Sequence, residues 1–433
     1  MEVPDCYYLN PPLLVRPCNP TPCHSLYLSN LDDQPFLRFS IKYLYVYRRS
    51  VPGAALAASL AKALVEYYPL AGRLVRSPAG EKLEIECNAQ GAVLAEAYAE
   101  FTADEFLRAS ARPHQSWRKL LYRQPAESFL DVPPLVVQVT HLSCGGMVLC
   151  TAFNHCLCDA VGTAQFLHAW ALLTAKPSGG AVLPVAAFHG RGLLKPREPP
   201  RIDFPHSEFT RPAQEHDDLA QFLLSQPLSP VSITFTAAQI LHLKKQCVPL
   251  LKCTSFEALA WHVWRAWVRA LDPPPALRVK LLFSVNVRRR LTPELPAGYY
   301  GNAFVLACAE TSAAELAASG ARFGVRLVQA AKDAVDDDHV RSVVDLLEQR
   351  RAQPDLSASL VISPWTKLGL EEVDFGGGRP AHMGPVASEI YCLFLPVVGD
   401  LNAFTMLVSV PQGVADKFRH YCTIKDSSEK ETS

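Results

Sequence analysis

A proline-rich stretch between Lys176 and Pro212, which contains the run KPREPPRIDFP, divides the 433-residue chain nearly in half. Proline lacks a backbone N–H and disfavours the helical conformation of the residue before it, so this stretch does not suit a helix or an inner strand. We expect it to be a long connection that crosses between two domains. No internal repeat with a period of about 20–50 residues is evident, which argues against a solenoid or a propeller.

Strand-like and helix-like segments alternate on both sides of this stretch. Alternation of apolar and polar side chains predicts strands, and apolar residues at helical spacing predict helices. In the first half the expected strands are residues 36–49, 82–88 paired through a turn with 91–98, 134–142 and 146–155, and the expected helices are 53–68 and one that begins near Asp159. In the second half the expected strands are 232–240, 279–290, 359–365, 388–397 and 403–410, and the expected helices are 254–271 and, with a break, 313–335.

The helix expected at residues 254–271 has the clearest start signal. Thr254 can act as its N-cap, and Glu257 three residues later completes a capping box. Because helices and strands are interspersed through both halves, the sequence predicts an α/β protein with two domains.

The charge balance and the cysteines limit the function and the compartment. Lys and Arg number 42 and Asp and Glu also 42, so the chain lacks the basic excess of nucleic-acid-binding proteins. The N-terminus has no basic segment followed by an apolar one, and the longest apolar runs are too short to span a bilayer. Thirteen cysteines are an odd number and too sparse for a disulfide scaffold. We expect a protein of a reducing compartment, most simply the cytosol.

The segment NHCLCD, residues 154–159, has the strongest chemical signal. His155 follows a predicted buried strand, whose rigid backbone would fix the direction of the imidazole. A neutral imidazole can remove a proton from a hydroxyl or an amine near neutral pH. Asp159 can fix the turn or the start of the next helix. A His and an Asp at this spacing also occur often by chance, so the pair alone does not establish an active site.

Cys144, Cys150, Cys156 and Cys158 lie near His155 and raise the alternatives of a metal site or a thiol nucleophile. They lack a paired Cys-x2-Cys arrangement, and small buried cysteines are common on strands. Neighbours in sequence also do not face one another on extended backbone. We therefore expect no metal at this segment and no cysteine nucleophile.

Three further segments stand out in the second half. In DFGGG, residues 374–378, Asp374 can cap a turn whose glycines suit a positive φ. In NVRRRLTPELPAGYYGNAF, residues 286–304, a basic cluster leads into a loop rich in Pro and Gly. The acidic run DDDH, residues 336–339, raises the alternative of a divalent ion, but we expect it to be an exposed, solvated loop.

Together these segments resemble the plant BAHD acyltransferases, which use acyl-CoA donors. His155 and Asp159 match the His-x-x-x-Asp motif of that family, and DFGGG resembles its Asp-Phe-Gly-Trp-Gly motif with Gly377 in place of Trp. Residues 286–304 resemble the Arg-rich stretch of the family that ends in Gly-Tyr-Phe-Gly-Asn, and residues 26–34 resemble its Ser-Asn-Leu-Asp opening. The likeness covers essentially the whole chain, and several motifs in a shared order are far more specific than any one of them.

The resemblance implies an α/β fold of two similar domains, like those of chloramphenicol acetyltransferase, with a channel between them. On this basis we expect an N-terminal domain at residues 1–195, a crossover loop at 196–230 and a C-terminal domain at 231–433. The first domain would contain the His-x-x-x-Asp motif and the second the DFGGG segment.

The resemblance also implies roles for individual residues. His155 would be the general base that deprotonates an acceptor hydroxyl or amine, which then attacks the acyl-CoA thioester directly. The acyl-CoA would be a co-substrate, and no metal, other cofactor or acyl-enzyme would take part. Asp159 would pair with a basic side chain and shape the site. Trp365 would donate its indole N–H to the oxyanion, although a packed core position is an equal alternative.

The DFGGG segment would have a structural role. By the resemblance, Asp374 would form a salt bridge with Arg288, and Arg290 is the next candidate. Gly377, where the family has Trp, is expected to reduce stability or alter packing on the CoA side rather than abolish the reaction.

Substrate contacts are implied in the same way. Thr254 and Ser255 would line the CoA channel at the start of a helix, where hydroxyls and helix N–H groups suit phosphate oxygens. Ser29 would line the acceptor side.

The implied activity is transfer of an acyl group from CoA to an alcohol by a monomeric, cytoplasmic enzyme of plant specialised metabolism, with no nucleic-acid partner and no membrane span. A hydroxycinnamoyl donor is the preferred prediction. The alternatives are an acetyl-CoA-dependent alcohol O-acetyltransferase and a catalytically silent relative that acts as an accessory protein of lipid or cuticle metabolism. Condensation domains of peptide synthetases carry a paired His-His, whereas Asn154 precedes His155 here.

Overall fold

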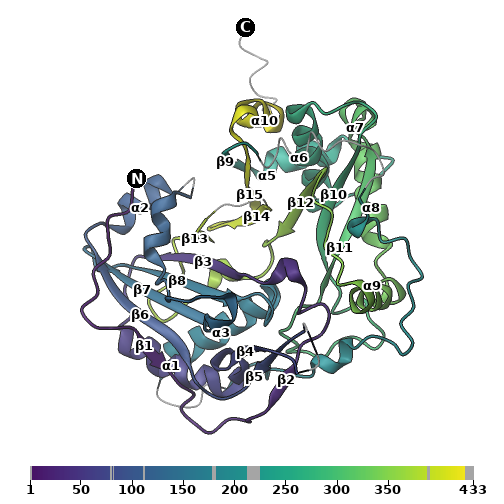
Figure 1. Cartoon of the computed structure of the whole chain (residues 1–433). Helices are drawn as coiled ribbons and strands as arrows, with labels where there is room; N and C mark the ends of the chain where they lie inside the picture. The colour runs from purple at the N-terminus through teal and green to yellow at the C-terminus, as the bar shows by residue number, and fades with distance from the viewer. Residues whose placement is uncertain are drawn as a thin grey trace.

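The computed structural model describes residues 2–78, 80, 82–110, 113–177, 182–211, 225–387 and 391–424. The chain folds into two lobes, each built on a six-stranded sheet (Figure 1). Helices pack against both sheets, and a separate three-stranded sheet belongs to the first lobe (Figure 1). The expected α/β class with two sheet-containing domains is confirmed.

The strands are β1 (Leu13–Val15), β2 (Ser25–Tyr27), β3 (Ser40–Tyr47), β4 (Arg73–Arg76), β5 (Leu83–Glu86), β6 (Ala92–Ala99), β7 (Leu135–Leu142), β8 (Met147–Asn154), β9 (Leu228–Phe235), β10 (Arg278–Asn286), β11 (Phe304–Ser312), β12 (Ser359–Pro364), β13 (His382–Pro385), β14 (Cys392–Val397) and β15 (Asp400–Pro411). The α-helices are α1 (Gly53–Glu66), α2 (Ala103–Ala109), α3 (Ala160–Ala175), α5 (Ala237–Lys245), α6 (Ser255–Leu271), α7 (Ala313–Ala318), α8 (Ala321–Asp333), α9 (Asp337–Arg350) and α10 (Ala415–Cys422). The short 3₁₀ helices that matter below are η1 (Pro35–Leu37), η5 (Arg191–Leu194) and η6 (Ser207–Phe209).

The first sheet has the strand order β1-β6-β7-β8-β3-β13. The two expected strands here are β7 and β8, which form an antiparallel pair, and β3 pairs with β8 on its other side. Side chains of β8 alternate between two cores: Leu149 and Phe153 pack with α1 and α3, whereas Val148 and Cys150 pack with α2 on the opposite face. Because β8 is buried on both faces, the residue that follows it is held on rigid backbone.

The second sheet has the strand order β11-β10-β12-β14-β15-β9. Its core is dominated by α6, which begins with the predicted capping box: Thr254 accepts from the N–H of Glu257, and the Glu257 side chain accepts from the N–H of Thr254. The tryptophans of α6 (Trp261, Trp264 and Trp267) are buried in this core. Their role is helix packing.

One segment of the second half of the chain returns to the first lobe. After β12 the chain packs Trp365, Leu370 and Phe375 into the first core, and β13 then pairs antiparallel with β3 at the sheet edge. The first lobe therefore includes a segment from the second half of the chain, which a single boundary before residue 231 does not describe. The boundaries at residues 195 and 230 stay a prediction.

The prediction that residues 82–88 and 91–98 form a hairpin is wrong. β5 pairs with β2 and β4 in the three-stranded sheet, whereas β6 pairs with β1 and β7 in the first sheet. Between them Ala89 and Gly91 have φ values of +52° and +105°, so the chain leaves one sheet and enters another.

Two helix starts were not predicted. The strand expected at residues 232–240 ends at Phe235, because Thr236 is the N-cap of α5 and forms a capping box with Gln239. The acidic run at residues 336–339 is not a loop, because the Asp336 side chain accepts from the N–H of His339 and caps α9. Acidic residues in a first turn favour a helix.

The connection between the halves runs from the end of α3 to the start of β9. Parts of it, residues 178–181 and 212–224, lie outside the described residues. Its ordered part contains η5 and η6, and Arg197 binds Asp345 of α9 at 2.7 Å. The long crossing connection predicted from the prolines is therefore present in the described part.

Candidate functional site

His155 lies directly after β8 and is held through its backbone on both sides. Its N–H donates to the carbonyl of Phe39 at 2.9 Å, and its carbonyl accepts from the side-chain amide of Asn302 at 2.7 Å. The ring packs edge-on against Phe39 at 5.3 Å and beside Phe304 at 6.0 Å between ring centroids. Because Phe304 begins β11 of the second sheet, His155 lies where the two halves of the chain meet.

The environment of His155 favours its neutral form. Burial, the largest cause, lowers the pKa of His155, although its own backbone carbonyl and the charge of Asp159 act in the opposite direction. A neutral imidazole is the form that can accept a proton. Nδ1 is buried and has no hydrogen-bond partner among the residues that the structure describes. Because Nδ1 is enclosed, Nε2 is the ring nitrogen left to meet a substrate.

Asp159 binds the second half of the chain. Its Oδ1 accepts from the N–H of Gly162 at 2.9 Å and so caps α3. Both carboxylate oxygens accept from the guanidinium of Arg288, at 2.8 and 2.9 Å, and Oδ2 also accepts from the N–H of Ala303 at 3.1 Å. The prediction that Asp159 pairs with a basic side chain is confirmed, and Arg288 is that residue.

This pair is nearly buried, with side-chain exposures of 13% for Arg288 and 7% for Asp159. Burial alone would raise the pKa of Asp159, but the Arg288 guanidinium and two backbone N–H groups outweigh it, so the pKa is lowered. Arg288 also donates to the carbonyls of Tyr299 and Gly301 at 3.0 and 2.8 Å. The pair thus fixes the loop of residues 299–301 against the turn that follows His155.

A second ion pair lies beside the first and is completely buried. Arg191 Nη1 is 2.9 Å from Asp32 Oδ1, and both side chains have 0% exposure. Arg191 Nη2 donates to the carbonyl of Leu157 at 2.7 Å. Asp32 Oδ1 also accepts from the backbone N–H and the side-chain amide of Asn302, at 2.8 and 3.1 Å. Asn302 therefore links Asp32 to the carbonyl of His155.

Two glycines permit this close packing. A Cβ at Gly301 would lie 1.4 Å from Arg191 Nη1, and a Cβ at Gly162 would lie 1.9 Å from the carbonyl oxygen of Tyr300. The Arg191 guanidinium also lies over the Tyr300 ring, 4.7 Å from its centroid. Neither glycine could be replaced without moving buried groups.

The thiols beside His155 are not suited to nucleophilic attack. Cys156 Sγ lies 3.7 Å from the carbonyl of Leu37, and Cys158 Sγ lies 3.3 Å from the hydroxyl of Thr163. Burial raises the pKa of both thiols, that of Cys158 to about 12, so both stay protonated at neutral pH. Within the described part of the chain, no candidate group of metal ligands includes a cysteine.

Trp365 lies in the first core. Its ring packs against Tyr43 at 4.6 Å, and its backbone N–H donates to the carbonyl of Phe394 at 2.8 Å. The residue is 6% exposed, as in the core-packing alternative. The indole N–H makes no hydrogen bond among the described residues, so its role as an oxyanion donor stays a prediction.

The predicted salt bridge between Asp374 and Arg288 is wrong. Asp374 Oδ1 accepts from the N–H groups of Gly376 and Gly378, at 2.7 and 2.9 Å, and so caps its own turn. This is the role that the residues alone had indicated. Arg290, the other candidate, instead donates to backbone carbonyls that precede α9.

The DFGGG turn lies far from His155. β3 (8 residues) and α3 (16 residues) both begin beside His155 and extend about 24 Å from it. At the far end of β3 Phe375 packs against Tyr47 at 6.0 Å, and at the far end of α3 a Cβ on Gly376 would lie 3.4 Å from the Cα of Ala175. This position explains why Gly377 is compatible with an intact site.

The remaining predicted residues have different positions. Ser29 is fully buried and its hydroxyl donates to Asp32 Oδ2 at 2.7 Å, so the prediction that it lines the acceptor side is wrong. Thr254 uses its oxygen to cap α6, and Ser255 is half-buried in the first turn of that helix. CoA contacts by Thr254 and Ser255 stay a prediction.

Three residues of the site were missed. Asp32 lies within residues 26–34 and Asn302 within residues 286–304, so both segments were recognised but their polar side chains were not assigned. Arg191 comes from the proline-rich connection, where no local signal marks it. All three bind partners far away in sequence, which no local pattern predicts.

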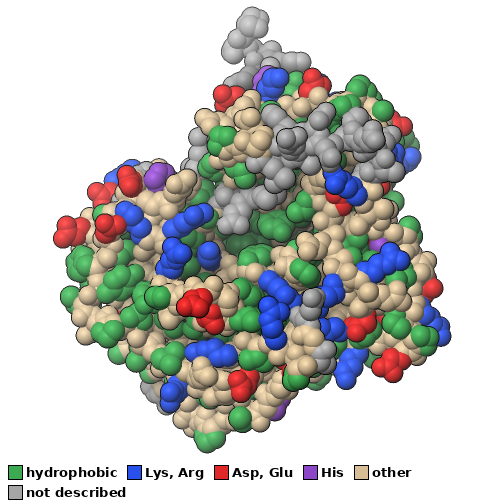
Figure 2. All heavy atoms as spheres, viewed as in Figure 1, with side chains coloured by type: hydrophobic (Ala, Val, Ile, Leu, Met, Phe, Trp, Pro, Cys, Tyr) green, Lys and Arg blue, Asp and Glu red, His purple; other side chains and the backbone are tan. Residues whose placement is uncertain are grey.

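The surface between the lobes is hollowed. Figure 2 shows hydrophobic side chains on the floor of this hollow and Lys and Arg side chains on its rims. Such a surface suits an apolar group joined to an anionic one. In the part of the chain that the structure describes, none of the helices has the length and apolarity needed to cross a membrane.

Known proteins resemble this chain over most of its length. The sequence matches the model of the family described as "Transferase family" over residues 13–421. It is 35% identical over 418 residues to the fatty alcohol:caffeoyl-CoA acyltransferase of Arabidopsis thaliana, covering 94% of this chain and 96% of that protein. It is also 35% identical over 422 residues to the omega-hydroxypalmitate O-feruloyl transferase of Arabidopsis thaliana, covering 94% and 91%.

Solved structures share the fold. Vinorine synthase superposes with a TM-score of 0.71 at 20% identity, covering 94% of this chain and 95% of that chain. F. graminearum TRI101, solved with ethyl coenzyme A, superposes with a TM-score of 0.76 at 14% identity, covering 94% and 98%. At these identities the likeness concerns the fold.

Proposed function

The chain belongs to the BAHD acyltransferases, and from that premise we propose that it moves an acyl group from CoA to an alcohol with His155 as the general base. The observation that carries the proposal is the half-buried imidazole of His155, whose burial lowers its pKa and so favours the neutral form. It is held by Phe39 and Asn302 at the junction of the two halves, and its Nδ1 is buried, which leaves Nε2 to meet a substrate.

The proposed reaction is a direct transfer. His155 Nε2 takes the proton of the acceptor hydroxyl, and the oxygen attacks the thioester carbonyl carbon. When the tetrahedral intermediate collapses the C–S bond breaks, and the proton passes from His155 to the CoA sulfur. The products are an ester and free CoA, and the imidazole is neutral again. Asp159 and Arg288 act as positioning residues, because they fix the turn that follows His155.

We propose the indole N–H of Trp365 as the donor to the oxyanion. Its ring is fixed by packing against Tyr43, and the N–H has no partner among the described residues. Trp365→Phe keeps an aromatic ring and removes the donor. We expect kcat to fall about 10²–10³-fold with little change in KM, as for loss of one oxyanion donor. A fall below about threefold would leave Trp365 with a packing role alone.

We propose a hydroxycinnamoyl donor and a long-chain alcohol acceptor. Two relatives at 35% identity are named for caffeoyl-CoA and feruloyl transfer, and their names give a fatty alcohol and a hydroxy fatty acid as acceptors. In this chain Phe39 and Phe304 flank His155, and Tyr391 stacks on Phe39 at 6.5 Å. Aromatic side chains of this kind suit a planar phenolic ring.

CoA is proposed to bind near the start of α6, where Thr254 and Ser255 lie. The enzyme is further proposed to act in the cytoplasm as a monomer, in plant specialised metabolism, with no cofactor in the transfer. All thirteen cysteines are free, which supports a reducing compartment.

Release of free CoA, followed with a thiol reagent, tests the proposed substrates. Caffeoyl-CoA, feruloyl-CoA, benzoyl-CoA and acetyl-CoA would each be combined with a long-chain alcohol, an aromatic alcohol and an amine. We expect the highest kcat/KM for a hydroxycinnamoyl donor with the long-chain alcohol. A higher value with acetyl-CoA would support the O-acetyltransferase alternative. Folded protein with no acceptor-dependent release would support the catalytically silent alternative.

A further inference from the structure

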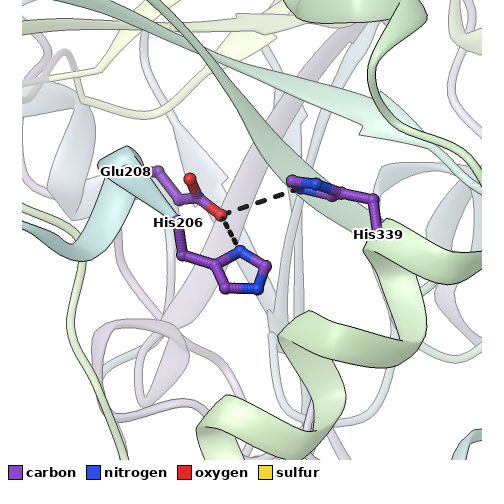
Figure 3. Close-up of side chains that lie close together, drawn as sticks. All are labelled: His206, Glu208 and His339. Atoms are coloured by element: carbon purple, nitrogen blue, oxygen red, sulfur yellow. Dashed lines mark hydrogen bonds and ion pairs between the residues drawn. The ribbon is translucent and has the colours of Figure 1, made fainter. Parts of the chain in front are cut away.

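A group of polar side chains outside this site joins the crossover connection to α9. His206 and Glu208 come from the connection at η6, and His339 comes from the first turn of α9 (Figure 3). Glu208 Oε1 lies 3.0 Å from His206 Nδ1 and 3.8 Å from His339 Nε2. The three possible donor atoms lie within 4.8 Å of one another. We propose that these residues bind a single divalent ion of the zinc class.

The chemistry of the donor atoms selects this class of ion. Imidazole and carboxylate are ordinary zinc ligands, with bonds of about 2.0–2.2 Å, so a tetrahedral ion places neighbouring donors about 3.3 Å apart. The distances from Glu208 Oε1 to the two imidazoles bracket that value. A small rotation of the His339 ring would complete the set, with water as the fourth ligand. Mg²⁺ and Ca²⁺ prefer oxygen ligands alone.

His206 is prepared for this role by a second hydrogen bond. Its Nε2 lies 2.7 Å from the hydroxyl of Ser342, a fully buried residue of α9. Metal-binding histidines usually bind such a partner through the nitrogen that does not face the ion. His206 also has a left-handed backbone, with φ +48°, which costs energy in a residue other than glycine. A metal bond would offset that strain.

His339 has an unused nitrogen that points at the carboxylate. Its Nε2 is buried and has no hydrogen-bond partner among the described residues, since 3.8 Å to Glu208 is too long for a hydrogen bond. Buried polar atoms are nearly always paired in native proteins. An ion between His339, Glu208 and His206 would satisfy this nitrogen.

The surroundings are compatible with a cation. Phe204 packs against the His339 ring at 5.1 Å and the His206 ring at 6.1 Å, which limits access of water. The nearby ammonium of Lys280 is bound to the carbonyls of the η6 turn and to Asp355 at 3.1 Å. Its charge is therefore balanced by a carboxylate other than Glu208.

The ion would attach the crossover connection to the second lobe. α9 already binds this connection through Asp345 and Arg197, and it binds the N-terminal segment through the carbonyl of Val344, which accepts from Asn30 at 2.9 Å. A metal at the start of α9 would add a further link between this helix and the connection. It would stabilise the fold and take no part in acyl transfer, so this proposal is independent of the proposed reaction.

Metal retention tests the site. The full-length protein is treated with EDTA, desalted, incubated with Zn²⁺, desalted again and analysed for bound metal, with Mg²⁺ in parallel. We expect about one equivalent of zinc in the wild type and a rise in Tm that Mg²⁺ does not give. Glu208→Gln and His339→Gln should lose both effects. His242→Gln, which alters an exposed histidine of α5, is the matched control and should retain both.

Co²⁺ gives a readout that needs no variant. Bound to imidazole and carboxylate, Co²⁺ should show visible bands of low-coordinate cobalt without the near-ultraviolet charge-transfer band of a thiolate ligand. A thiolate band would show that the metal binds cysteines and would overturn the proposal. The same conclusion follows if the wild type retains no more zinc than His339→Gln, or if His242→Gln loses as much.

Discussion

The His155–Asp159 segment and the Asp374–Gly378 turn are both recognisable in the sequence, but they are built in different ways. The Asp159 carboxylate has 7% exposure and binds Arg288, which is 129 residues away. The Asp374 carboxylate is exposed and binds only N–H groups of its own turn among the described residues. An aspartate in a motif therefore has a role set by its partners rather than by the motif.

The two segments also differ in their distance from His155. Asp159 caps α3 at the end near His155, and Gly376 of the other turn lies against Ala175 at the far end of the same helix. One motif can therefore affect the reaction directly, whereas the other stabilises the first lobe from about 24 Å away. The following predictions test this contrast, from the largest expected effect to the smallest.

Arg288→Met should give the largest loss of stability. It leaves Asp159 buried with an unpaired charge, which typically costs about 3–5 kcal/mol of unfolding free energy. Urea unfolding of the variant and the wild type measures the loss. Arg290→Met, two residues further along the same turn, is the control, because that guanidinium binds only backbone carbonyls among the described residues. A loss for Arg288→Met no greater than for Arg290→Met would contradict the role of the ion pair.

The pH dependence of activity should have its acid limb below the ordinary histidine range. Only the neutral form of His155 can act as a base, and burial lowers its pKa below 6.5, so kcat/KM should be constant through neutral pH. As pH falls through that lowered pKa, kcat/KM should decrease about tenfold per pH unit. Asp374→Ala should not move this limb. A midpoint at or above pH 6.5 would show that His155 is not held in a desolvated site.

Asp374→Ala should have a small effect. The side chain accepts two hydrogen bonds in an exposed turn, so its loss should cost about 0.5–1.5 kcal/mol. Thermal and urea unfolding measure this cost, and kcat/KM should stay within about twofold of the wild type. A cost as large as that of Arg288→Met would mean that Asp374 has a partner outside its turn.

Gly377→Trp should not increase the stability of the protein. A Cβ at this position would lie 3.1 Å from the carbonyl oxygen of Arg49, so the backbone of residue 49 already packs closely against this glycine. We expect a loss of stability of about 1 kcal/mol or less and unchanged kcat. Gly377→Ala is the control for the Cβ alone. A clear rise in Tm for the Trp variant would show that the turn retains space for the ring of the family motif.

Local signals in the sequence predicted the elements that depend on local contacts. The cap of α6 follows from Thr254 and Glu257, and β7 and β8 follow from their short apolar runs. That β5 and β6 belong to different sheets could not be predicted, because β5 pairs with β2 as well as β4, and β6 pairs with β1 and β7. The start of α9 was missed because a run of charges was interpreted as loop rather than as a capped first turn.

The sequence predicted the site residues that a motif identifies, and it missed those whose role depends on partners far away in the chain. His155 and Asp159 were identified from a motif, but Arg288 was assigned to the wrong aspartate. Asp32 and Arg191 form a fully buried pair 159 residues apart, which only the folded chain reveals. The buried histidines His206 and His339 likewise come together from segments with no shared pattern.

The central claim is that His155 is the base of the transfer, and His155→Ala tests it most directly. The substitution leaves the backbone carbonyl that Asn302 binds, so the fold should persist and Tm should stay close to that of the wild type. Free-CoA release with the best donor and acceptor should fall about 10²–10⁴-fold. Equal rates for folded variant and wild type would contradict the claim.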